Sequence, residues 1–155
     1  MAAFTLNGKF LTDVQNRQRR GLTAAGAFYL AQVAQTLTNS PPRHGREYQW
    51  FKGHLSAMPK SGKVRGRVHV ASAPGEAPAL LTGDLRRRRG SRIGAGSGDD
   101  LVMRFGSSVP YARRLEKGGT DKRGVTIAPR PAWKPTMEAS LPVLKRIFAE
   151  VFRRG

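Results

Sequence analysis

The sequence predicts an α+β protein, and three observations carry that prediction. Apolar residues recur every three or four positions between residues 11 and 37, which is the period of an amphipathic helix. A second helical period runs from about Ala132 to Arg153. Between them, short apolar runs separated by glycine-rich turns indicate a small antiparallel sheet. A chain of 155 residues has room for one ordinary domain, so we expect these elements to share one core.

The first helix is expected to be long and to end abruptly. Thr12 or Asp13 is a suitable N-cap. Residues 39–42, Asn-Ser-Pro-Pro, should end the helix, because tandem prolines remove backbone donors and push the preceding residue out of the α region. The apolar residues that define the period are Leu11, Val14, Leu22, Ala25, Tyr29, Val33 and Leu37.

Residues 39–81 are predicted to form a long, basic, extended arm outside the core, which we place at about 11–38 and 82–153 of a single domain 1–155. The arm is rich in Pro, Gly, His, Lys and Arg. Its segment 63–71 mixes basic and apolar residues in the manner of a short strand. Because a loop this long is uncommon inside a compact domain, we expect the arm to reach toward a neighbouring subunit.

The segment from residue 82 to the last helix is expected to hold several short elements. Pro142 falls inside the last helix and must kink it or mark its true start. The expected elements are a helix that Thr82 caps and Gly90 closes, two strands of a hairpin around Ile93 and residues 101–105, a helical turn over 111–117, and a third strand at 125–127.

The net charge of the chain indicates which classes of partner it can bind. Lys and Arg total 28 against 10 acidic residues, a formal net charge of +18. Such a charge fits nucleic acid, an anionic membrane surface or acidic protein neighbours. The chain has no cysteine, no signal-peptide pattern in its first thirty residues and no apolar run of roughly 18 to 20 residues. We therefore expect synthesis in a cytoplasm and no membrane span.

Catalysis is not indicated. The three histidines, His44, His54 and His69, are scattered and lack the spacing of a zinc site. The pair Asp99-Asp100 lies in a glycine-rich turn, where acids are easily solvated. The glycines at 94, 96 and 98 have no βαβ unit around them and no Gly-Lys-Ser or Gly-Lys-Thr after them. We predict no enzyme, no metal and no cofactor.

The strongest local feature is a run of arginines, and its interpretation stays open at this point. Three interpretations compete: a solvated helix face, a contact with an acidic ring neighbour, and a contact with DNA. Three aromatic residues of the arm lie among basic residues, where stacking on bases is a further interpretation. The candidate contact residues are Arg86, Arg87, Arg88, Arg89, Arg92, Tyr48, Trp50 and Phe51.

Three blocks of the sequence resemble the small neck and minor-tail components of tailed bacteriophages and prophages. Residues 72–85 contain Ser-x-Pro-Gly-Glu-x-Pro-Ala and then Thr-Gly-x-Leu; residues 111–120 contain Tyr-Ala, Leu-Glu and Gly-Thr; residues 128–135 contain Pro-Arg-Pro followed by an aromatic residue. The motif residues are Pro74, Gly75, Glu76, Pro78, Thr82, Gly83, Leu85, Tyr111, Glu116, Pro129, Arg130 and Pro131.

The resemblance implies a structural virion protein without catalysis. It implies a homo-oligomeric ring, a hexamer or a dodecamer, in the neck between the head-closure ring (connector) and the tail terminator, with possible contact with the genome end. Synthesis would occur in the host bacterial cytoplasm. Two alternatives remain: a tail terminator or tail completion protein, and a basic nucleic-acid-binding module.

The motif blocks also carry structural expectations. Pro129 and Pro131 restrict their own φ angles, so the chain should enter the last helix from one preset direction. For Glu116 we consider two roles, a partially buried partner of an arginine and an exposed, unpaired acid. The chain departs from the resembled pattern at Arg87 to Arg89, where serine and isoleucine are expected, and at Gly118, where an aromatic residue is expected.

Overall fold

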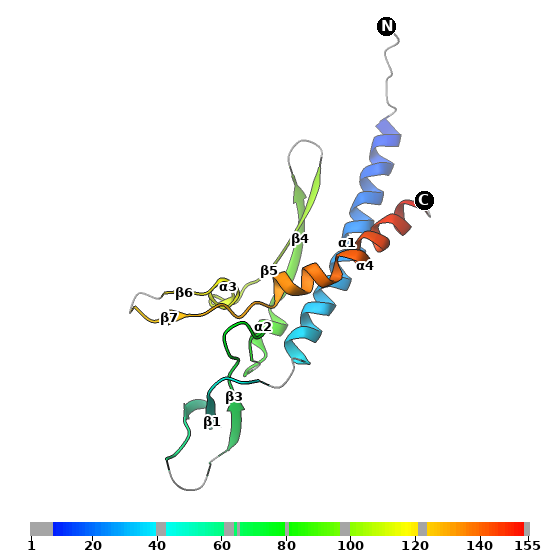
Figure 1. The fold of residues 1–155 in the computed structure, drawn as a ribbon. Coiled ribbons are helices and arrows are strands. Elements are labelled where there is room, and N and C mark those ends of the chain that lie inside the picture. Colours follow the sequence, from blue (N-terminus) through cyan, green and yellow to red (C-terminus); the bar gives the residue numbers. More distant parts are fainter. Residues whose placement is uncertain are drawn as a thin grey trace.

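The computed structural model describes residues 8–39, 43–60, 64, 66–79, 81–96, 100–120 and 124–153. It confirms the α+β prediction: a long first helix, small antiparallel sheets and a C-terminal helix (Figure 1). No helix in these described ranges is both long and apolar enough to cross a membrane. The elements are α1 (Gly8–Thr38), β1 (Glu47–Phe51), β2 (His54–Ala57), β3 (Arg67–Val70), α2 (Asp84–Arg87), β4 (Arg89–Ala95), β5 (Leu101–Ser107), α3 (Ala112–Lys117), β6 (Gly119–Thr120), β7 (Thr126–Ile127) and α4 (Trp133–Arg153).

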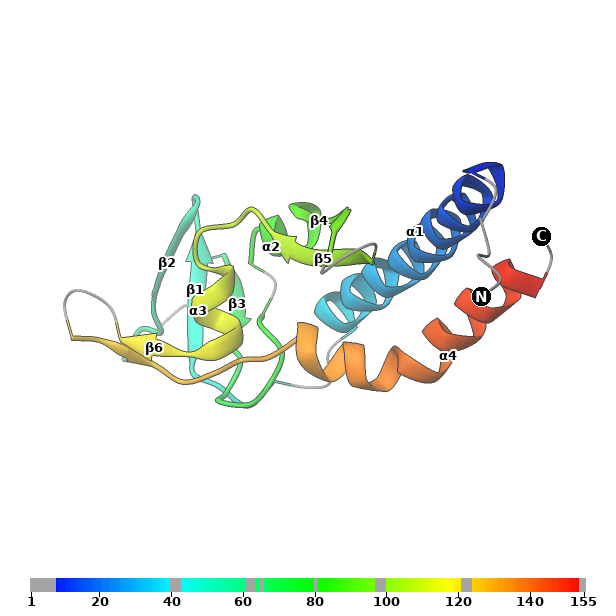
Figure 2. The same ribbon diagram turned by 90° about the horizontal axis from the view of Figure 1, so that it is seen from above.

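Helices α1 and α4 lie side by side and run antiparallel (Figures 1 and 2). Near the end of α1, the hydroxyls of Thr36 and Thr136 are 2.9 Å apart and hydrogen-bonded. Near the middle of α1, a Cβ on Gly21 would lie 2.8 Å from the Phe148 ring, so the absence of a side chain lets α4 approach. Since α1 already begins at Gly8, the prediction that Thr12 or Asp13 caps it was wrong.

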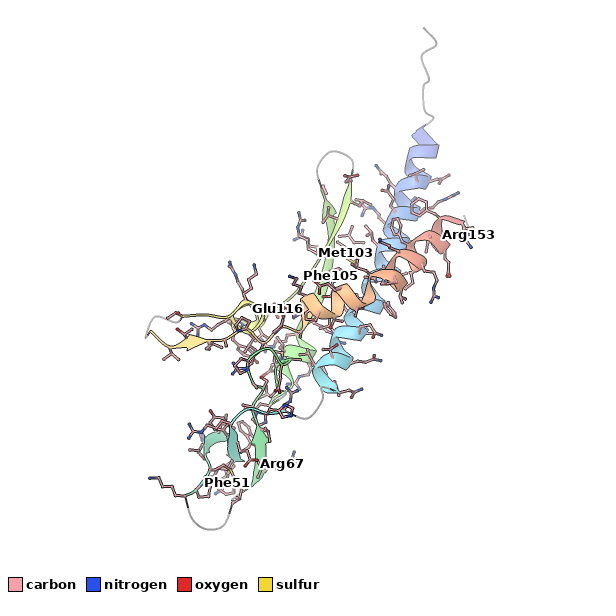
Figure 3. All side chains as sticks on the ribbon, in the orientation of Figure 1. Phe51, Arg67, Met103, Phe105, Glu116 and Arg153 are labelled. Carbon is pink, nitrogen blue, oxygen red and sulfur yellow. The ribbon has the colours of Figure 1, made fainter. Side chains whose placement is uncertain are left out.

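The predicted hairpin is β4 and β5, whose residues alternate between two environments. On the inner face, Met103 and Phe105 point toward α1, as Figure 3 shows. A Cβ on Gly26 of α1 would overlap the sulfur of Met103, so this glycine makes room for the hairpin. On the outer face of β5, Val102, Arg104 and Gly106 are exposed. Period-two alternation therefore gives the hairpin one packed face and one open face.

The buried core is small and sits where α1, the hairpin and the start of α4 meet. The Tyr29 ring packs edge to face on Phe105, with ring centroids 4.6 Å apart. Such contacts stabilise a core beyond the area that they bury. The buried hydrophobic residues are Tyr29, Val33, Leu37, Leu85, Val109 and Ala132.

The region predicted as an extended arm contains a three-stranded antiparallel sheet, in the order β2-β1-β3. Strand β3 lies inside the predicted segment 63–71, whereas β1 and β2 were not predicted. A two-residue turn joins β1 to β2, and both of its residues, Lys52 and Gly53, have positive φ, at 46° and 82°. Positive φ at both central positions suits the right-handed twist of a hairpin. The sheet projects from the domain on the side away from α4 (Figure 1).

Three further details of the sequence prediction are settled. Gly90 does not close α2, because α2 ends at Arg87 and Gly90 lies in β4. The third strand exists as β7, but it pairs with β6 and not with the hairpin. Pro142 lies inside α4 and does not mark its start. Pro41, Pro42 and Asp99 lie outside the described residues.

Gly118, placed where the resembled pattern has an aromatic residue, is a position at which the fold requires glycine. It has φ 71° and ψ −169°, a region that only glycine adopts readily. A Cβ there would also lie 2.8 Å from the Ile127 carbonyl oxygen and 2.9 Å from Pro129 Cδ. An aromatic residue at this position would be strained in this chain.

Gly118→Ala is expected to lower the free energy of unfolding by about 1–3 kcal/mol, the cost of a strained backbone conformation. Gly90→Ala is the matched control, because its Cβ would have no neighbour within 4 Å and its φ is not positive. Urea denaturation measures both. Equal losses for the two variants would contradict the strain at Gly118.

Candidate functional site

The three sequence blocks of the resemblance meet in space, and we call their meeting point the motif junction. It consists of residues 72–76, residues 115–116 and residues 129–134. These segments are far apart in the chain, yet each one is hydrogen-bonded to another. Figure 3 shows Glu116 of α3 beside the start of α4.

Glu116 caps the start of α4 from another element. Its carboxylate accepts hydrogen bonds from the backbone N–H groups of Ala132 at 2.8 Å, Trp133 at 3.1 Å and Lys134 at 2.9 Å. The next residue, Pro135, has no N–H, and the Thr136 N–H bonds the Ala132 carbonyl at 3.4 Å. The donors that a helix start normally leaves unpaired are therefore satisfied, and a negative charge sits at the positive end of the helix dipole.

Neither role considered for Glu116 from the sequence is right. Its partners are backbone amides, and none of the ion pairs among the described residues includes it. The capping residues of a helix usually lie just before it in the sequence. Here the cap is 16 residues away from Ala132 along the chain.

The Pro-Arg-Pro block is held on both sides. The Arg130 N–H donates to the Leu115 carbonyl at 2.6 Å, and its side-chain Nε donates to the Ser72 carbonyl at 3.0 Å. The Gly75 N–H donates to the Pro129 carbonyl at 2.9 Å. This block therefore ties the first block to the second, in agreement with its expected role of setting the entry to the last helix.

Glu76 organises the first block. Its carboxylate accepts from the Ala73 N–H at 2.7 Å, and it contacts His44 through the backbone N–H at 3.2 Å and through the ring Nδ1 at 2.6 Å. The Ala73 amide, followed by the His44 ring, holds the pKa of Glu76 below its ordinary value of 4.5. The turn residue Gly75 has φ 84°, which glycine adopts without strain.

Tyr29 connects the motif junction to the core. Its hydroxyl donates to the Trp133 carbonyl at 2.8 Å. Burial, and after it the negative charge of Glu116, raises the pKa of Tyr29 to about 12. The neutral phenol, which is the form that donates, is therefore kept over the whole ordinary pH range.

The other motif residues support the same region. Thr82 is not at the N-cap position, which Gly83 occupies with φ 76°, but the Thr82 hydroxyl donates to the Asp84 carboxylate at 2.6 Å. Leu85 and Pro78 are buried, and Tyr111 is exposed at the start of α3. Among the described residues, no three side chains of the metal-ligating types gather in one place. The junction is a hydrogen-bonded framework.

The arginine run does not lie on one helix, although the sequence predicted a helix that continues to Gly90. Arg86 and Arg87 belong to α2, Arg88 follows as its C-cap, and Arg89 begins β4. Arg87 pairs with Asp84 at 2.9 Å, and Arg89 donates from Nε to the Leu30 carbonyl at 3.0 Å and from Nη1 to the Arg86 carbonyl. The Arg86 guanidinium also donates to the Thr38 hydroxyl, at 3.4 Å, so three members of the run are bound within the chain itself.

The three aromatic residues of the arm lie in β1 and do not share a face. By register, Tyr48 and Trp50 lie on one face of the sheet and Phe51 on the other. Arg46 stacks over Tyr48 and Lys52 over Phe51, at 5.7 and 5.6 Å from the ring centroids. The sheet that carries them lies apart from the β4–β5 hairpin (Figures 1 and 2). The structure does not bring these aromatics together with the arginine run.

Comparisons of the chain with known protein families, with curated proteins and with solved structures give no match. The motif junction and the surfaces around it are therefore the basis for the functional inferences that follow.

Glu116→Gln is expected to lower the free energy of unfolding by about 1–2 kcal/mol, because it removes the charge at the helix start and turns an amide donor toward backbone donors. Glu138→Gln is the control. It also removes one negative charge, but from an exposed side chain of α4 whose Oε1 lies 3.9 Å from Lys134 Nζ. Thermal and urea denaturation measure both. A loss no larger than that of the control would contradict the capping role.

Acidification should lower the stability of the fold by protonating the Glu76 carboxylate. Because folding lowers the pKa of this carboxyl, its contribution to stability is complete above pH 4.5 and is lost as pH falls through the folded-state pKa. Glu76→Gln should be less stable than wild type at neutral pH and should lose less on acidification. Thermal denaturation as a function of pH tests this; parallel acid profiles for the two proteins would contradict it.

Proposed function

We propose that the chain is a non-enzymatic structural subunit that assembles into a ring in the neck of a tailed-phage virion, between the head-closure ring and the tail terminator. The observation that carries the proposal is the motif junction. Residues that resemble the blocks of neck components, distant from one another in sequence, are here hydrogen-bonded to one another. The residues that carry the resemblance are therefore the residues that organise the fold. Short motifs that matched by chance would have no reason to contact one another, so this arrangement supports the resemblance.

The exposed area of the chain supports assembly. The accessible surface is 11372 Å². A compact monomer of 17.0 kDa exposes about 7,700 Å², so the surplus is about 3,700 Å². A subunit in a ring has two neighbours and contributes about 800 Å² to each standard interface, or about 1,600 Å² in all. The chain has enough surplus surface for two neighbours and for flanking rings.

The apolar part of that surface points to a specific contact. A groove of about 400 Å³ runs between α1, α4 and the inner face of the hairpin, and Leu22, Met103, Met137 and Phe148 line it. In our proposal a second copy of the chain occupies this groove. A contact in which one surface of a subunit meets a different surface of the next forms a ring when the rotation between neighbours closes, and an open filament when it does not; we propose the closed case. On one face of the β2-β1-β3 sheet, the exposed side chains of Phe51 and Val68, at 41% and 49% exposure, offer the other surface.

Two alanines of α4 provide a matched test of this contact. Ala149 lines the groove and Ala139 does not, and both positions are exposed. Ala149→Glu should convert the assembled protein into monomers while its circular dichroism stays unchanged, because it places a charge among apolar groups. Ala139→Glu should assemble like wild type. Light scattering during size-exclusion chromatography gives the masses, and negative-stain microscopy should show closed rings.

A wild-type chain that remains a monomer at high concentration would refute the ring. Two variants with the same mass distribution would refute the groove as the contact. The virion assignment has its own test: the gene is expected between the portal and major tail protein genes, and a different neighbourhood would count against the neck.

A further inference from the structure

The outer face of the β4–β5 hairpin is a basic hollow that the proposed ring contact does not use. By register, Gly90 lies opposite Gly106, Arg92 opposite Arg104, and Gly94 opposite Val102. These pairs alternate with the inner-face pairs, so they share the face that is turned away from α1. A hollow of about 470 Å³ lies on this hairpin, and Arg88, Gly90, Arg92, Arg104, Gly106 and Ser108 are among its lining residues.

Among the described residues, no acid forms an ion pair with either of the two arginines on this face. They are cross-strand neighbours, and like charges directly opposite each other destabilise a strand pair. Within the described ranges, the guanidinium groups of Arg92 and Arg104 also form no hydrogen bond with another residue. Two like charges held this close without a partner in the described chain indicate a site for an external anion, which would neutralise both.

The glycines make the hollow accessible. A Cβ placed on Gly90 or on Gly106 would meet nothing within 4 Å, so the space above the ribbon is open. Neither residue has a positive φ, so the backbone conformation does not demand glycine at either position. Arg104 reaches along the ribbon, with Nη1 3.2 Å from the position of a Cβ on Gly94. The result is a bare strip of backbone flanked by guanidinium groups.

We propose that this face binds the phosphodiester backbone of duplex nucleic acid. Arginine and serine side chains are typical phosphate contacts, and a two-stranded ribbon has a width that the major groove of DNA admits. An acidic protein partner fits less well, because the centre of a protein interface is depleted in charged residues. The only larger apolar side chain among these three outer pairs is Val102. The proposal is independent of ring assembly and deals with a different surface.

The test uses the whole chain and a short fluorescein-labelled duplex of mixed sequence, with binding followed by fluorescence anisotropy over a range of salt concentrations. Wild type should bind with a salt slope set by its phosphate contacts. The double variant Arg92→Gln/Arg104→Gln should reduce the slope by about 1.8, about 0.9 for each lost contact. The control Arg113→Gln/Arg146→Gln removes the same charge from two exposed positions on α3 and α4 and should leave the slope nearly unchanged.

A second pair of variants separates shape from charge. Gly90→Val and Gly106→Val keep every charge and suit a strand, and the Cβ of each would meet nothing within 4 Å, but they fill the strip over which the phosphates would lie. Both should weaken duplex binding while thermal stability is kept.

Three results would overturn the proposal. The first is wild-type binding by the valine variants. The second is an equal loss of slope in the two arginine pairs, which would mean that only net charge attracts DNA. The third is a glutamate-rich peptide or an anionic phospholipid vesicle that competes with the duplex and depends on Arg92 and Arg104 in the same way.

Discussion

The cap that Glu116 places on α4 is the interaction on which the rest of the structure depends. One carboxylate fixes three backbone amides at the start of the last helix and so decides where that helix begins and in which direction it leaves. The start of α4 in turn supplies the carbonyl that binds the Tyr29 hydroxyl and places Ala132 in the core. Through these contacts the cap determines how α4 lies against α1.

This dependence arises because the core is small. A chain with few buried apolar residues and a net charge of +18 gains little from hydrophobic burial alone. Hydrogen bonds between loops therefore carry a large share of the specificity. The Arg130 contacts with Leu115 and Ser72 are of this kind, as are those of Glu76 with Ala73 and His44. Such a framework leaves most of the apolar and basic surface free for partners.

Sequence patterns predicted the elements with strong periodicity and missed those set by distant contacts. The period of apolar residues predicted α1 and α4, and short apolar runs on either side of a glycine-rich turn predicted the hairpin. Strands β1 and β2 were missed because the Lys52-Gly53 turn lacks the Asn-Gly or Asp-Gly signal of a two-residue hairpin loop. The capping role of Glu116 was missed, because bonds to backbone amides leave no mark in side-chain types. Pro135, which removes one of the donors at the start of α4, was the available hint.

The hairpin separates two kinds of chemistry. Its inner face contributes Met103 and Phe105 to the core and to the apolar groove, whereas its outer face presents arginines and bare glycine backbone. The alternation of side chains along a strand is what allows two surfaces so different to lie one residue apart. In our account one surface serves contacts between copies and the other serves nucleic acid. The arginines of the chain thus have two kinds of role. Some, such as Arg89 and Arg130, bond to backbone carbonyls within the chain, and others form a positively charged surface.

The central claim, that the Glu116 cap holds α4 in place, is tested most directly by native-state hydrogen exchange of the backbone amides, measured by NMR. The account predicts that the amides of Ala132, Trp133 and Lys134 exchange as slowly as the core amides of Val33 and Leu37. These three amides come before Thr136, the first residue of α4 whose N–H bonds a carbonyl four residues earlier. Their protection should disappear in Glu116→Gln. Rapid exchange of the three amides in the wild-type protein, at the rate of an open helix end, would contradict it.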